Sequence, residues 1–98
     1  MSIFDDLYNS RSEVHLTATE GYMIALKTFI DMFNRTKPGV NYYTTWTDED
    51  NKKCNIKAAE SAIHVIDNII KKDRVVYRVV NALFKDEIKE MREVLSKT

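Results

Sequence analysis

The chain contains few of the residues that end helices or cross-link a fold. Its 98 residues include two glycines, one proline and one cysteine. Because glycine and proline are the residues that interrupt helices most strongly, their scarcity favours long helices over sheets joined by tight turns. The single cysteine, Cys54, has no second thiol with which to form an internal disulfide, so we expect a reducing compartment, the cytoplasm.

The chain also lacks an excess of charge and lacks long apolar runs. Basic and acidic residues number 15 each, so a net charge of zero gives no overall attraction to nucleic acid or to an acidic membrane. No stretch approaches the roughly 18 apolar residues of a membrane span, and the first ten residues carry acids where an export signal needs bases. With 44% apolar and 31% charged residues, the composition predicts one globular domain, residues 1–98, without membrane association.

Helical periodicity appears first in the N-terminal third. Apolar residues three and four positions apart predict a helix over 18–35, which the proline and glycine of the sequence TKPG at 36–39 should end. Thr17 and Glu20 have the spacing of a capping box at its start. A short helix over 3–9 is predicted by the spacing of Ile3, Phe4, Leu7 and Tyr8.

A second helix is predicted over 48–71, with a start that is well marked. Thr47 and Asp50 form a further capping-box pattern, and acids at 48–50 suit the positive end of the helix dipole. Apolar residues cover about half of the circumference, more than an outer helix of a bundle needs. This helix is therefore either central, with two neighbours in the same chain, or covered by a partner in an oligomer.

A third helix is predicted over 74–96. Asp73 is a candidate N-cap, but no glycine separates it from the preceding helix, so one long or kinked helix is an alternative. The sequence RVVYRVV at 74–80 is β-branched enough for a strand. We favour a helix because Val76, Val80 and Leu83 continue as one apolar stripe towards residue 95, and a lone strand would have no partner. The expected fold is an all-α, small helical bundle.

Patterns for catalysis and metal binding are weak. Glu60, His64 and Asp67 fall on one face of the second helix, but the same face carries lysines and other polar residues, as an ordinary solvated face does. Cys54 has no cysteine or histidine at zinc-binding spacing. We therefore predict a protein that is not an enzyme and uses no cofactor or metal.

Three aromatic residues, Tyr42, Tyr43 and Trp46, cluster between the first two long helices. Three interpretations are open. The aromatics, Trp46 above all, could cover the end of the core. They could anchor a protein interface. Beside Arg35 and Lys37, they could instead stack on a nucleotide or nucleic-acid base.

Glu87 falls within the apolar stripe of the third helix, where an unpaired buried carboxylate would be costly. Either a basic partner reaches it, or this end of the helix projects past the core, or Glu87 lies at an interface where a partner chain supplies a lysine or arginine. Glu87 and the broad apolar arc of the second helix are the two features that indicate association with another chain.

The expected function is that of a non-enzymatic protein-interaction module, a helical adaptor, inhibitor or regulator that docks onto another protein as a homo-oligomer. Its Asn-, Lys- and Ile-rich usage suits a small accessory protein of an AT-rich bacterium or its phage. The alternative is a nucleotide- or nucleic-acid-binding module, which would use the aromatics together with Arg35, Lys37, Lys71, Lys72, Arg74 and Arg78.

Overall fold

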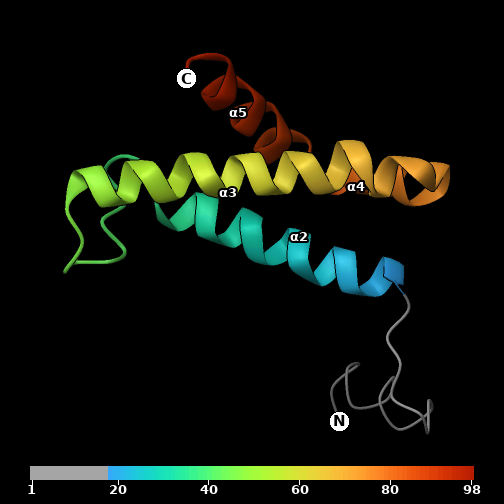
Figure 1. Ribbon diagram of the computed structural model, residues 1–98, viewed down its shortest axis with the longest axis horizontal. Helices are drawn as coiled ribbons and strands as arrows, with labels where there is room; N and C mark the ends of the chain where they lie inside the picture. The colour runs from blue at the N-terminus through green and yellow to red at the C-terminus, as the bar shows by residue number, and fades with distance from the viewer. Residues whose placement is uncertain (1–17) are drawn as a thin grey trace, which may run out of the picture.

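The computed structural model describes residues 18–98, which form an all-α fold (Figure 1). The helices are α2 (Ala18–Arg35), α3 (Asp48–Asn68), α4 (Arg74–Leu83) and α5 (Lys85–Ser96), and a 3-10 turn, η1 (Ile70–Lys72), lies between α3 and α4. No strand occurs within 18–98, so the predicted helical bundle is confirmed. The predicted helix over 3–9 and the cap at Thr17 lie outside the described residues.

The start of α3 is set by the predicted capping box. The Thr47 hydroxyl accepts a hydrogen bond from the Asp50 amide at 3.1 Å, and the Asp50 carboxylate accepts one from the Thr47 amide at 3.3 Å. Two backbone N–H groups that the helix leaves unpaired are satisfied in this way. The first turn also carries Asp48 and Glu49, whose charges suit the positive end of the helix dipole.

Helix α3 is central, with α2 along one side and α5 on the other (Figure 1). Small side chains on α3 allow the neighbouring helix to approach closely: Ala59 and Ala62 are fully buried, as is Leu26 on α2. The core around them consists of Leu26, Ile30, Phe33, Ala58, Ala59, Ala62, Val65, Ile66, Ile70, Val80, Ile88 and Met91. Two neighbours in the same chain therefore account for the broad apolar arc, and the arc no longer argues for an oligomer.

The chain turns sharply between α3 and α4. Asp73 has an extended backbone (φ −107°, ψ 104°), and its carboxylate accepts hydrogen bonds from the amides of Val75 and Val76 at 3.1 and 3.2 Å. This is the predicted N-cap, and it excludes one continuous helix through this region. The β-branched sequence after it is helical, as predicted.

The predicted helix over 74–96 is in fact two helices, because the chain bends at Phe84 (φ −117°, ψ 31°). No glycine or proline marks the bend. It lets α5 fold back across α3, where Ile88 and Met91 are buried in the core. The bend also leaves Leu83, expected in the core, 64% exposed.

Two ion pairs fasten α5 to the rest of the fold. The Arg92 guanidinium donates to both carboxylate oxygens of Asp67 on α3, at 3.0 and 2.9 Å. Lys37, in the loop after α2, pairs with Glu90. The hydrogen bond to Arg92 lowers the pKa of Asp67. Bidentate pairing of this kind fixes geometry as well as adding stability.

Replacing Asp67 by Asn should lower the free energy of unfolding at about pH 7 by roughly 0.5–1 kcal/mol, since the pair is partly exposed to solvent. The folded-state pKa of Asp67 lies below its ordinary value, so its contribution is present above that ordinary value. It is lost as the pH falls through the folded-state pKa. Urea denaturation of both proteins at about pH 7 and about pH 3 should therefore show a smaller difference at the lower pH.

The control is Glu93→Gln on α5, because Glu93 is exposed and has no ion pair within 18–98. It should change stability little at either pH. An equal loss for Asp67→Asn at both pH values would contradict the assignment.

Candidate interaction surfaces

The three aromatic residues of the loop between α2 and α3 contact one another. Tyr43 and Trp46 are stacked, with ring centroids 4.2 Å apart and an interplanar angle of 21°. Tyr42 meets Tyr43 edge to face at 5.0 Å and 78°. The loop reverses direction at Gly39 (φ 84°) and Asn41 (φ 52°), both in the left-handed region that glycine and asparagine tolerate best.

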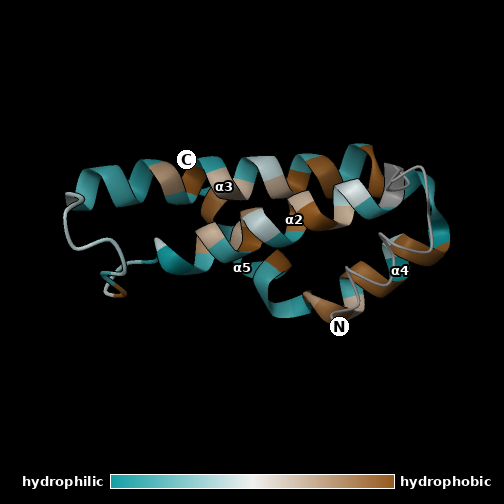
Figure 2. Cartoon of the chain, turned by 90° about the horizontal axis from the view of Figure 1, so that it is seen from below, coloured by the Kyte–Doolittle hydropathy of each residue, from teal (hydrophilic) through white to brown (hydrophobic). Residues whose placement is uncertain are grey.

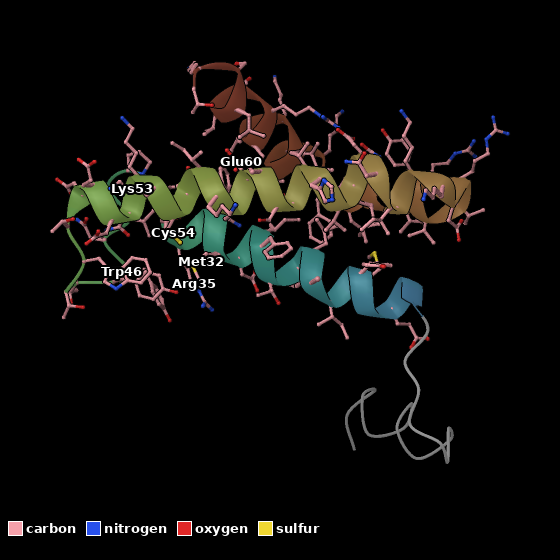
Figure 3. The ribbon with its side chains drawn as sticks, in the orientation of Figure 1. Met32, Arg35, Trp46, Lys53, Cys54 and Glu60 are labelled. Carbon is pink, nitrogen blue, oxygen red and sulfur yellow. The ribbon has the colours of Figure 1, made fainter. Side chains whose placement is uncertain are left out.

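This cluster is attached to the C-terminal end of α2. The Arg35 guanidinium lies 4.9 Å from the centre of the Tyr42 ring, and a side-chain hydrogen bond to Tyr43 raises the pKa of Arg35. The Tyr43 hydroxyl donates to the Met32 sulfur at 3.6 Å. Figure 3 shows Trp46, Arg35 and Met32 gathered at this end of the fold. The rings are therefore held by each other and by α2.

These contacts bear on all three interpretations of the aromatics. Trp46 is 40% exposed and packs on Tyr43, and it is not among the side chains packed against the core, which weighs against the first interpretation. Arg35 already lies over Tyr42, and Lys37 pairs with Glu90, which engages both cations proposed for nucleotide binding. What stays available to a partner is the outer surface of Tyr42 and Trp46.

The other basic residues proposed for nucleic-acid binding lie far from this cluster. Lys71, Lys72, Arg74 and Arg78 are all exposed, beyond the C-terminal end of α3, whereas the aromatic loop precedes its N-terminal end (Figure 1). A 21-residue helix is about 30 Å long. The two groups therefore form separate surfaces, not one extended basic and aromatic face.

The residues considered for catalysis make local structural contacts. His64 Nδ1 lies 3.1 Å from Asn68 Nδ2, and Asp67 is held by Arg92, while Glu60 is exposed. Within 18–98, no three His, Cys, Asp or Glu side chains gather closely enough to hold a metal ion. Partial burial raises the pKa of the Cys54 thiol, which disfavours the reactive thiolate.

A buried asparagine, which the sequence analysis overlooked, joins α3 to the end of α2. Asn55 is 6% exposed, and its Nδ2 donates to the Phe33 carbonyl at 2.8 Å and to the Thr36 hydroxyl at 3.2 Å. The Phe33 carbonyl is one of those that the end of α2 leaves unpaired. Asn55 also borders a hollow of about 600 Å³ between the loop, α3 and α5. The sequence could have predicted this burial, because Asn55 lies one turn before Ala59 on the apolar side of α3.

A row of exposed apolar residues lies on α4. Val75, Val79 and Leu83 are 73%, 47% and 64% exposed, and they follow one another at four-residue steps along one side of the helix. We call these three residues the α4 face. Val76 and Val80 point inward, Val80 being fully buried. The repeated VV pairs at 75–76 and 79–80 were the sequence signal, because they place valine on both sides of the helix.

Glu87, the remaining predicted interaction residue, lies in the first turn of α5, the helix that follows α4. It is half-buried and makes no ion pair with any residue in 18–98. The partial positive charge of a helix N-terminus tolerates a carboxylate at this position.

No protein-family model, curated protein or solved structure matches this chain. None of the helices in the described part of the chain has both the length and the apolar character needed to cross a bilayer.

Changing Asn55 to Ala should lower the free energy of unfolding by about 1–3 kcal/mol, because the Phe33 carbonyl and the Thr36 hydroxyl would each lose a buried donor. Urea denaturation measures this. The matched control is Asn51→Ala, one turn earlier on α3. The amide of Asn51 bonds only to the Thr47 carbonyl, and its Oδ1 is buried without a partner. That substitution should lower the free energy of unfolding by less than about 0.5 kcal/mol. Equal losses in the two variants would refute the conclusion that the Asn55 side chain holds the end of α2 against α3.

Proposed function

We propose that this chain is a non-enzymatic interaction module that docks through the α4 face and works as a homo-oligomer. The observation that carries the proposal is the exposure of Val75, Val79 and Leu83 as one row on one helix. Scattered apolar residues are normal on a protein surface, but a contiguous apolar row marks an interaction site. Burying such side chains against a partner gives the main favourable term in association.

The non-enzymatic part of the proposal is supported by how the polar side chains are used. His64 and Asp67 are engaged with Asn68 and Arg92, which connect or support helices. Cys54 is partly buried and disposed to stay protonated. A single thiol also suits a cytoplasmic location, which belongs to this proposal.

The proposal assigns the aromatic cluster a separate role, the binding of a second protein. Tyr42 is 57% exposed and Trp46 40% exposed, and both lie at the opposite end of α3 from the α4 face. An oligomer formed through α4 leaves them accessible. Tyrosine and tryptophan are favoured as interface anchors, so this end of the molecule suits a second, different protein, as an adaptor or regulator requires.

The proposal predicts concentration-dependent association. The wild-type chain should change from monomer to oligomer between about 5 and 200 μM in sedimentation experiments, a range suited to a small interface. The variant Val75→Ser/Val79→Ser/Leu83→Ser should stay monomeric. Its melting temperature at low concentration should change little, because the three side chains are exposed and add little to the core.

The control is Tyr22→Ser/Ile24→Ser on α2, where two other apolar side chains are 39% and 40% exposed. This variant should associate like the wild type. A wild-type chain that stays monomeric at about 200 μM would overturn the homo-oligomer, and association of the triple variant would remove the α4 face from the proposal.

A further inference from the structure

We infer that the α4 face binds the α4 face of a second copy, with the two helices antiparallel about a two-fold axis that passes beside Val79. This inference rests on the proposed function and specifies the partner and the register. In this arrangement each residue lies opposite the one at equal distance on the other side of position 79. Val79 therefore meets its own copy, and Val75 meets Leu83. A two-fold interface must be self-complementary in this sense.

The charges beyond the two ends of α4 favour the antiparallel arrangement. The chain carries Lys71 and Lys72 before α4, and Asp86 and Glu87 after it. The chain turns at Asp73 and bends at Phe84, so these groups lie just outside α4, and an antiparallel pair brings the basic end of each copy towards the acidic end of the other. A parallel pair would instead place lysines near lysines and acids near acids. Opposite charges across an interface fix its register, and like charges oppose it.

In the antiparallel dimer, Glu87 gains a partner for an ion pair. Its carboxylate is half-buried and has no ion pair within 18–98. Lys72, at the opposite end of α4, is exposed and likewise makes no ion pair in the described part of the chain. In the antiparallel pair the basic end of each copy faces the acidic end of the other, so both groups are neutralised.

The position and length of α4 suit a weak pair. Figure 2 shows α4 at one edge of the fold, with apolar residues along its length. Ten residues make a helix about 15 Å long, which contributes less than the roughly 800 Å² per partner of a standard interface. Affinity in the micromolar range is therefore expected, with the charges at both ends making it sensitive to salt.

Disulfide cross-linking tests the register directly. In a Cys54→Ser background, Val79→Cys should cross-link to itself under mild oxidation, because the axis brings the two copies of this position together. Val75→Cys should not, since its two copies would lie about 12 Å apart along the helices, too far for a disulfide. A mixture of Val75→Cys and Leu83→Cys chains should form the mixed cross-link. A parallel pair would cross-link at position 75 with itself.

Charge reversal gives an independent test by sedimentation at low salt. Lys71→Glu/Lys72→Glu should raise the dissociation constant about tenfold, and so should Asp86→Lys/Glu87→Lys, since each opposes like charges. Combining all four substitutions should bring the constant back to within about threefold of wild type. The control is the other lysine pair, Lys52→Glu/Lys53→Glu on the first half of α3, which should have no effect.

The outcomes separate this inference from the proposed function. A dimer abolished by the serine substitutions in α4 but lacking the position-79 cross-link, or lacking charge rescue, would overturn the register and leave the docking surface intact. A monomer at all concentrations would overturn both the homo-oligomer and the register. The α4 face would then be covered by a different protein.

Discussion

The close contact between α2 and the alanine-rich side of α3 is the interaction on which the rest of the structure depends. Leu26 and Phe33 on α2 and Ala59 and Ala62 on α3 are almost completely buried in the same core, where the methyl groups of the alanines leave room for larger side chains. The same contact places the end of α2 within hydrogen-bonding distance of Asn55. The position of the aromatic loop follows, since its rings are fastened to the last turns of α2.

The two bends on either side of α4 decide which apolar residues are left outside. After the turn at Asp73, α4 contributes one fully buried side chain, Val80, to the core. After Phe84, α5 returns to α3, in a direction that a straight continuation of α4 would not have taken. Helix α4 therefore connects two helices that are packed in the core, while much of its own apolar surface is exposed to solvent. A segment with so few buried contacts also opens more readily than the core does.

Capping signals predicted the helix starts well because they are local. The hydroxyl of Thr47 and the carboxylate of Asp73 bond to amides within three residues, so the chemistry could be anticipated from spacing alone. The bend at Phe84 could not, because it reflects the burial of Ile88 and Met91 against a helix distant in sequence. Leu83 was misplaced for the same reason. The aromatic residues were identified, but their contacts with Arg35 and Met32 depend on how the loop folds.

Asn55 has a consequence for the uniqueness of the fold. Alanine and leucine surfaces can slide past each other at modest cost, and moving α2 by one helical turn, about 5.4 Å, would still bury apolar side chains against α3. Such a shift would separate the Asn55 amide from the Phe33 carbonyl and the Thr36 hydroxyl and leave that amide without a partner in an apolar setting. A single buried polar side chain thus selects one alignment of the helix pair from several that hydrophobic packing alone would accept, much as a buried asparagine does in a coiled coil.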